Sequence, residues 1–545
     1  LGDQSDAPDY LLNNKAKNHY YMLPLLLGLL GLFFQFARDK RGTWLTFLMF
    51  FMTGIAVVIS LTQPPYQVRE RDYAYAGSFY SFSIWIGLAV AALYSWIKER
   101  GCNAERKGKS CEVITASAVT AVCLAVPALM AAENWDDHDR SNRYTAVEMA
   151  KNYLNSVGQN GILITHGDND TFPLWYAQEV ENVRPDVRIC NTSLLGTDWH
   201  IDQMKYAVNE SAPLDLQVGQ NQYLYGTNEY VYIYDTRDTI VPLADVMRVF
   251  RHPEAKLPLQ SGRTVDYILS RRFSIPVNKE NIIKYGILDE KYSDMIPDEI
   301  VLSIPKDKDY LTKPEIFMLD LLSNYQWDRP ISLLSMGGDI NVGQKDYLMY
   351  DGFSFRFVPI KNRMKSTEIG FADAEDLYNK MKNVYTWDAL KRTDYFVDYQ
   401  NLYTFCGVLS QRQLFVNVAK EMVKIGDTVR AVEMLDMCQE CVPEENFPLD
   451  QVYLGFSNEY MVLDMIHMYY EAGENEKALD LATRMAESLF GSLIFFMENY
   501  DYAKREMEVC YVSLSDIADM ADFYGDTELA TTIDKFFDSV IGSEE

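Results

Sequence analysis

A short polar segment between two apolar runs carries the first side chains suited to chemistry. It reads PPYQVRERDYAY at residues 64–75, and two arginines alternate there with two acids. Guanidinium groups bind phosphate through paired hydrogen bonds, and neighbouring carboxylates orient them. We therefore predict a phosphate or pyrophosphate site at Arg69, Glu70, Arg71, Asp72 and Tyr73. The alternative is an aromatic and arginine anchor at a membrane interface.

A second candidate is the acidic sequence NWDDHD at residues 134–139. Its three carboxylates and one imidazole could hold a divalent cation or act as acid and base. The residues concerned are Asp136, Asp137, His138 and Asp139. Because consecutive residues cannot all face one ion, the alternative is a solvated linker that caps the next helix.

A third candidate combines THGDNDTFPLWY at residues 165–176 with NTSLLGTDWH at residues 191–200. Each segment follows an apolar run typical of a buried strand, and ligands bind at the carboxyl edge of parallel strands. Tryptophan faces stack on sugar rings, whereas Asp and Asn bind hydroxyls, so we predict a sugar or acceptor site. An anion cradle at the following helix N-terminus is a related prediction, and an Asx-turn with core tryptophans is the alternative. The predicted residues are His166, Asp168, Asn169, Asp170, Trp175, Asp198 and Trp199.

The elements around this third candidate read as alternating helices and strands. We expect a helix from about residue 142 to Leu154, a strand ILIT, a loop HGDND, and a helix with Pro173 in its first turn. A second strand DVRICNTSLL follows, and the alternation predicts a parallel sheet. Further strands are expected at 230–234, 300–305, 330–336 and 353–360, with a helix at 313–326.

Four apolar stretches in the first quarter of the chain predict membrane spans, at about 20–37, 43–61, 78–96 and 113–132. Eight Lys and Arg residues lie in or beside the loops at 38–41 and 98–109, against four on the other side. Since basic loops stay cytoplasmic, these two loops are predicted to face the cytoplasm. Residues 62–77 and everything after Ala132 are then periplasmic, in an inner-membrane protein of a Gram-negative cell.

The chain beyond residue 132 is strongly acidic. The first 132 residues carry 12 of the 50 basic and 9 of the 78 acidic side chains, so the remainder has a surplus of 31 acids. Such a region disfavours nucleic acid and anionic lipid surfaces as partners. A lone CQEC at 438–441 is interpreted as part of a helix rather than a redox pair or zinc site.

The C-terminal third is predicted to be helical throughout. Three segments resemble one another, with Gly followed five residues later by Ala: IGDTVRA at 425–431, AGENEKA at 472–478 and YGDTELA at 524–530. We interpret them as the turns of degenerate helical hairpins similar to tetratricopeptide repeats, which usually offer a surface to a partner protein. The predicted organisation is a four-span membrane region at 1–132, an α/β domain at 133–371 and helical repeats at 372–545.

Three long motifs resemble a known family. They are QPPYQVRERDYAYAGSFYSFSIWIG at 63–87, NWDDHDRSNRYTA at 134–146 and GDNDTFPLWYAQEVENVRPDVRICNTSLLGTDWHIDQMK at 167–205. They are similar to the C-terminal half of a Bacteroidetes membrane-protein family, domain of unknown function 2723, which itself resembles protein O-mannosyltransferases. The resemblance implies a GT-C fold, a polyprenyl-phosphate sugar donor and an active site facing outward.

The family places its catalytic carboxylate in the first extracytoplasmic loop. The chain begins at Leu1 without a signal peptide, so we expect that loop to precede it, and no catalytic residue is predicted within the chain. The resemblance implies a glycosyltransferase in which Arg69 and Arg71 grip the donor phosphate. The α/β domain would receive a protein or glycan acceptor, and the repeats would dock a periplasmic protein. A divalent cation is the candidate cofactor. The alternative function is a non-catalytic, membrane-anchored periplasmic scaffold.

Overall fold

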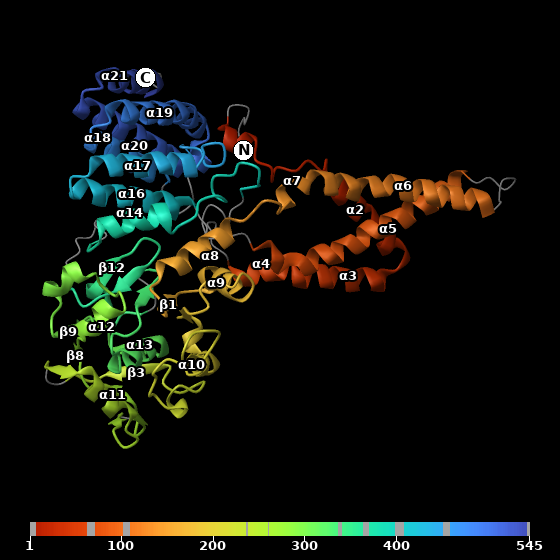
Figure 1. Cartoon of the computed structure of the whole chain (residues 1–545). Helices are drawn as coiled ribbons and strands as arrows, with labels where there is room; N and C mark the ends of the chain where they lie inside the picture. Colours follow the sequence, from red (N-terminus) through yellow and green to blue (C-terminus); the bar gives the residue numbers. More distant parts are fainter. Residues whose placement is uncertain are drawn as a thin grey trace.

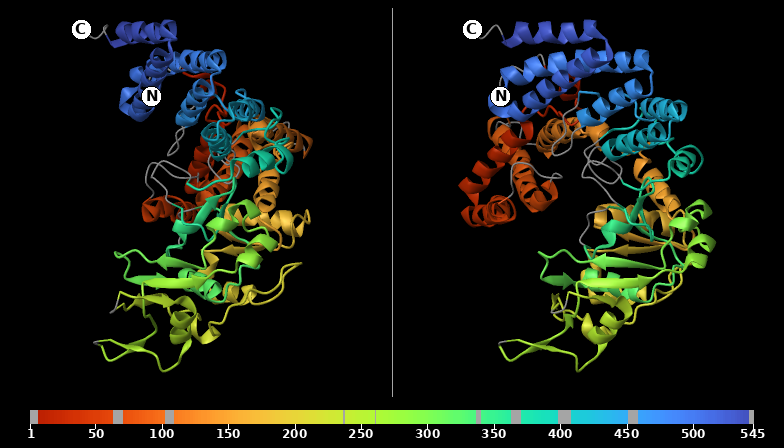
Figure 2. Two further views of the ribbon diagram at one scale, coloured as in Figure 1. Left: turned by 60° about the vertical axis from the view of Figure 1, so that its left-hand side comes forward. Right: turned by 90° about the vertical axis from the view of Figure 1, so that its left-hand side faces the viewer.

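The molecule has three parts in chain order, which Figure 1 colours from red to blue. Apolar helices come first, a mixed α/β region follows, and helices make up the rest. In Figure 2 the C-terminal helices lie at one end of the molecule and the small strands of the α/β region at the other. This computed structural model describes residues 7–62, 71–101, 109–235, 238–259, 261–335, 340–362, 370–397, 408–450 and 458–541.

Among its described residues the apolar part contains three helical segments long enough to cross a membrane, where the sequence predicted four. These segments are Lys40–Leu61, Tyr73–Arg100 and Ser110–Glu133. The first predicted span is the shorter helix α2, Leu23–Arg38, because Tyr21 and Met22 have positive φ and delay its start. Its 16 residues extend about 24 Å, less than a hydrocarbon core of about 30 Å. The other helices are α3 (Lys40–Thr53), α4 (Ile55–Leu61), α5 (Ala76–Gly101) and α6 (Lys109–Glu133).

Two glycines bring α2 against α5. A Cβ atom on Gly28 would lie 2.1 Å from the Phe82 ring, and one on Gly31 would lie 1.7 Å from the Trp85 carbonyl oxygen. Close approach through small residues is the usual way in which apolar helices associate in lipid. Gln35 adds a polar contact, since its Oε1 accepts a hydrogen bond of 2.8 Å from the Trp85 indole.

The central sheet has five strands in the order β12-β13-β11-β1-β2. β1 (Ile162–Thr165) is parallel to β2 (Arg188–Asn191) and to β11 (Ile331–Leu333), which confirms the predicted parallel pairing. The other half of the sheet is antiparallel, which the alternation of strands and helices did not predict. There β13 (Phe355–Phe357) runs antiparallel to β11 and to β12 (Leu348–Tyr350), because a short turn joins β12 directly to β13.

Successive side chains of β1 point to opposite faces of the sheet, and both faces are covered. Leu163 packs beneath α8 (Thr145–Ser156) and α9 (Asp168–Glu179). Ile162 and Ile164 belong to a larger apolar core that includes α13 (Lys313–Ser323).

Between α10 (Asp198–Met204) and α13 the chain forms three small sheets. One contains β3 (Tyr230–Ile233), β7 (Tyr267–Ile268) and β10 (Tyr310–Thr312). Another contains β4 (Ile240–Pro242), β8 (Arg272–Pro276) and β9 (Glu299–Ser303), and the third pairs β5 (Leu257–Pro258) with β6 (Thr264–Val265). The helices here are α11 (Leu243–Arg251) and α12 (Lys279–Lys284), with the short 3-10 helices η4 (Gln220–Gln222) and η5 (Glu290–Met295). The strands and the helix expected between residues 230 and 360 are all present, with shorter bounds than predicted.

The C-terminal helices stack as hairpins whose turns are the three predicted motifs. The turns lie at Gly426, Gly473 and Gly525, each with φ between 80° and 95°. Only glycine adopts this left-handed conformation without strain. The alanine five residues later is buried in each case, so the repeated spacing reflects a tight turn followed by helix packing. The helices are α14 (Ala374–Asn383), α16 (Val408–Lys424), α17 (Thr428–Cys441), α18 (Asn458–Glu471), α19 (Asn475–Glu498), α20 (Tyr500–Tyr524) and α21 (Thr527–Ile541).

The CQEC sequence lies inside α17, as interpreted. Cys438 and Cys441 are buried and have free thiols. Burial raises the pKa of each thiol to about 12. A thiol that stays protonated is a poor nucleophile and metal ligand, which agrees with a packing role.

Candidate functional site

The predicted phosphate site lies mostly outside the described residues. Arg69 and Glu70 belong to that undescribed segment. Arg71 is exposed and precedes the 3-10 helix η1 (Asp72–Tyr75), in which Tyr73 is 65% exposed. The phosphate site therefore stays a prediction, with Arg71 accessible to solvent.

The acidic sequence at 134–139 forms a link between α6 and α8. Asp137 is buried in the short helix α7 (Trp135–His138), where it accepts hydrogen bonds from Asn18 (3.2 Å) and His138 (2.8 Å). Asp139 accepts one from the Ser141 amide (2.8 Å), and hydrogen bonding to Ser141 lowers the pKa of its carboxyl. Among the described residues no group of three or more His, Cys, Asp or Glu side chains could hold a metal ion. The geometry favours the linker interpretation.

The carboxyl ends of β1 and β2 meet at one edge of the sheet, as the third candidate requires. Asn191 at the end of β2 donates to the Gly167 carbonyl (3.0 Å) and to the Thr171 hydroxyl (2.8 Å). Thr171 in turn shares a 2.6 Å hydrogen bond with Thr165 at the end of β1. These three side chains are buried, so they fix the two loops against each other.

The last three residues of the predicted loop HGDND, Asp168 to Asp170, form the first turn of α9. Asp170 is the third residue of that helix, and its carboxylate accepts the amides of His166 (2.9 Å) and Gly167 (2.8 Å). Asp170 therefore caps the helix, since its carboxylate accepts hydrogen bonds from amides that would otherwise lack partners. This agrees with the alternative interpretation, in which the segment has a structural role. Pro173 consequently lies inside the helix, not in its first turn. An anion cradle is disfavoured, since Asp168 and Asp170 bring two negative charges to this helix end.

The two tryptophans flank a buried histidine. His200 lies between Trp175 and Trp199, with ring centroids 6.4 Å and 5.2 Å away. Its Nε2 accepts the Asn191 amide (3.4 Å), and burial lowers its pKa. A neutral His200 therefore serves the structure. Trp175 is half-buried and also stacks on Phe172, whereas Trp199 is 47% exposed and remains accessible beside Asp198.

A shallow pocket opens at the carboxyl ends of the three parallel strands. Ile164, Thr165 and His166 line it from β1, Thr192 from β2, and Leu333, Leu334 and Ser335 from β11. His166 is exposed, and its Nδ1 lies 3.4 Å from the Thr192 hydroxyl. Asp168 and Asn169 are exposed on the adjoining turn of α9. Hydroxyl, imidazole, amide and carboxylate groups thus share one edge, which suits a ligand rich in hydroxyls.

The sequence argument missed Thr165, Thr192 and Ser335 at this edge. Each lies at the end of a strand of the sheet or just beyond it, and the strand ends were the available signal. In the structure, Asp198 and Trp199 lie near this edge, but neither residue lines the pocket.

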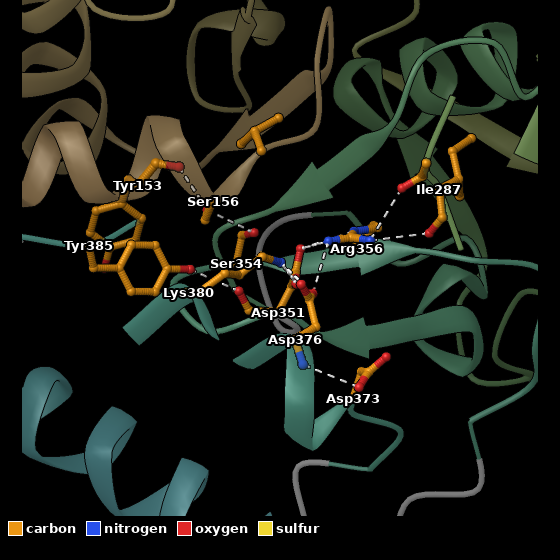
Figure 3. A network of polar contacts seen from close by, with 12 residues as sticks. Tyr153, Ser156, Ile287, Asp351, Ser354, Arg356, Asp373, Asp376, Lys380 and Tyr385 are labelled. Carbon is orange, nitrogen blue, oxygen red and sulfur yellow. Dashed lines mark hydrogen bonds and ion pairs between the residues drawn. The ribbon is translucent and has the colours of Figure 1, made fainter. Parts of the chain in front are cut away.

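A buried ionic network at the junction of the α/β region with α14 was not foreseen (Figure 3). Asp351 accepts hydrogen bonds from Arg356 and Lys380, and Asp376 pairs with Lys380 at 2.8 Å. Burial alone would lower the pKa of Arg356, but the Asp351 carboxylate outweighs burial and raises it. Because its charges are paired, we interpret the network as a structural joint. A solvent-open cleft of about 490 Å³ borders it.

Comparison with known proteins identifies one family model. TMEM260-associated domain 2 matches residues 146–376, from α8 through the sheet to the start of α14. The α/β region is thus similar to a domain associated with a membrane-protein family. No curated protein matches the chain, and no solved structure does.

Proposed function

We propose that this chain belongs to a membrane glycosyltransferase that works on the periplasmic side of the inner membrane. The family match carries this proposal, because TMEM260 is related to protein O-mannosyltransferases. The matched region follows three helices with the length and composition of membrane spans. The donor would be a polyprenyl-phosphate sugar and the acceptor a protein or a glycan.

The arrangement of the apolar helices supports this orientation. The end of α5 and the start of α6 lie at the far end of the helices from the α/β region (Figure 1). Lys98 and Arg100 lie in the last turn of α5, and basic residues favour the cytoplasmic side. The α/β region would then face the periplasm.

Donor and acceptor would be held by different parts of the chain. Arg69 and Arg71 would bind the donor phosphate between α4 and α5, with Glu70 and Asp72 orienting them. His166, Asp168 and Asn169 would hold the hydroxyl-rich acceptor at the carboxyl edge of the sheet. The acceptor hydroxyl would displace the phosphate at the anomeric carbon of the sugar, and a carboxylate base would take its proton.

Steady-state kinetics of the full chain in liposomes, with labelled sugar on a polyprenyl-phosphate donor, tests the acceptor assignment. His166→Ala and Asn169→Ala should raise the KM for acceptor several-fold with little change in the KM for donor. Arg71→Ala should raise the KM for donor. Arg248→Ala is the matched control, because this arginine is 73% exposed and pairs with Asp245 on its own helix. Unchanged KM values in all three site variants would contradict the proposal.

The stacked C-terminal hairpins favour the second candidate, a non-catalytic scaffold. Helices α16 to α21 form a layered array of the kind that binds proteins along its surface. A scaffold would retain its bound partners in the Arg71→Ala variant and transfer no sugar in any variant.

A further inference from the structure

Every outward side chain of the small sheet β10-β3-β7 carries a hydroxyl group. Along β3, Tyr230 and Tyr232 point outward, and Val231 between them is fully buried. Tyr232 lies directly opposite Tyr310 on one neighbouring strand and Tyr267 on the other. Thr312 lies opposite Tyr230 and completes the set. One face of the sheet thus packs on the core, while the other is a surface of tyrosines.

This surface is open to solvent. Tyr230, Tyr232 and Tyr310 are 62%, 46% and 45% exposed, and Tyr234 just beyond β3 is 50% exposed. No hydrogen bond joins their phenol oxygens, or that of Tyr267, to any other described residue. Such a contiguous aromatic surface is unusual on a protein without a bound partner.

The rings are held in place against one another. Tyr230 meets Tyr310 edge to face, with centroids 4.8 Å apart. Tyr234 meets Tyr267 in the same way at 6.2 Å. Paired rings on a rigid sheet have little freedom left to lose when a ligand binds. Alternate residues of a strand are about 7 Å apart, so Tyr230, Tyr232 and Tyr234 offer a length of about 14 Å.

Two acidic side chains at the border of this surface are each paired with a cation. Glu229 contacts Lys313 at 2.7 Å, and Asp309 contacts Arg271 at 3.6 Å. A border of cancelled charges does not select an anionic polymer or a strongly charged protein. Tyrosine also offers what a sugar needs, because its ring face packs on C–H bonds and its hydroxyl bonds to sugar hydroxyls.

We propose that the tyrosine face of β10-β3-β7, formed by Tyr230, Tyr232, Tyr234, Tyr267 and Tyr310, is a binding platform for a neutral oligosaccharide chain. It lies at the end of the molecule opposite the C-terminal helices (Figures 1 and 2), and none of these tyrosines lines the pocket at the edge of the central sheet. The platform would hold a glycan several sugars long while a different part of the chain holds its reacting end.

The test is isothermal titration of the full chain in detergent with mannohexaose, maltohexaose and a galactohexaose. The unchanged protein should bind at least one of them, and Tyr232→Thr with Tyr310→Thr should weaken that binding at least tenfold. Threonine suits strands, and β10 is an edge strand, so Tyr310→Thr alone serves if the double variant does not fold. Tyr206→Thr with Tyr502→Thr is the matched control, since these tyrosines are 68% and 72% exposed elsewhere.

Three results would overturn the inference. They are no binding of any of the three hexaoses, equal binding by the platform variant, and a change in self-association in place of a change in sugar binding. The last result would assign the surface to a second copy of the chain. Binding is measured without donor, so its failure would leave the proposed transferase standing.

Discussion

Glu148 is expected to make the stability of the protein depend on pH near neutrality. It projects from α8, is 7% exposed, and accepts the backbone amides of Ala389 (2.8 Å) and Leu390 (3.1 Å). Burial raises the pKa of its carboxyl to about 7 against the opposing effect of these hydrogen bonds. This side chain therefore joins the α/β region to the segment after α14 with a carboxyl that titrates in an accessible range.

The direction of this pH dependence follows from the difference in proton binding between the folded and the unfolded protein. The folded protein holds this proton more tightly than the unfolded chain, whose glutamate pKa is 4.5. The stability contributed by the protonated group is complete below pH 4.5 and is lost as the pH rises to about 7. A shift from 4.5 to about 7 corresponds to about 3 kcal/mol of unfolding free energy.

Denaturant unfolding followed by tryptophan fluorescence, between pH 5 and pH 8, measures the effect. Glu148→Gln keeps an oxygen that accepts a backbone amide but has no proton to lose. As the pH rises from 5 to 8, the unfolding free energy of the unchanged protein should fall by about 2–3 kcal/mol more than that of this variant. Glu476→Gln, at an exposed position of α19, should behave like the unchanged protein. Parallel pH curves for the unchanged protein and Glu148→Gln would refute the reasoning.

Three further predictions test the packing. Asp351→Ala should lower the unfolding free energy by about 3–5 kcal/mol, because it removes the buried carboxylate that pairs with Arg356 and Lys380 and leaves them only the partly exposed Asp376. Asp376→Ala changes a side chain that is 40% exposed, so it should lower the unfolding free energy by less than about 1 kcal/mol. Equal losses of unfolding free energy in the Asp351→Ala and Asp376→Ala variants, measured by denaturant unfolding, would contradict the proposed structural joint. Gly31→Leu should abolish the monodisperse peak in detergent size exclusion, whereas Gly87→Leu, with open space at its Cβ, should keep it. Asp170→Ala should cost about 1 kcal/mol in thermal unfolding through loss of the α9 cap, and an unchanged midpoint would argue against capping.

The features that the sequence predicted correctly depend on local signals. The apolar run ILIT forms β1, and the parallel partner β2 follows one helix later. Gly426, Gly473 and Gly525 mark the turns of the hairpins because few other residues adopt a positive φ there. Such signals lie within a few residues, so a single sequence reveals them.

The features that the sequence analysis missed depend on contacts between distant segments or on which of several neighbouring residues caps a helix. The carboxylate of Asp170 captures the amides of the preceding loop and starts α9 three residues earlier than Thr171. The network of Asp351, Arg356 and Lys380 joins a strand pair to a helix, and no spacing in the sequence indicates that their charges meet. The edge of the pocket was predicted in part, because the sequence indicated the strand ends but not the hydroxyl groups that line the pocket.

Donor-dependent sugar transfer tests the central claim most directly. The full chain, purified from membranes and placed in liposomes, would receive a polyprenyl-phosphate sugar labelled in the sugar and a hydroxyl-bearing acceptor. The account predicts label on the acceptor that requires the donor and falls at least tenfold in the Arg69→Ala, Arg71→Ala double variant, with the Arg248→Ala control unaffected. Label that never leaves the donor, with the protein folded and still holding its partners, would contradict it and identify the chain as a scaffold.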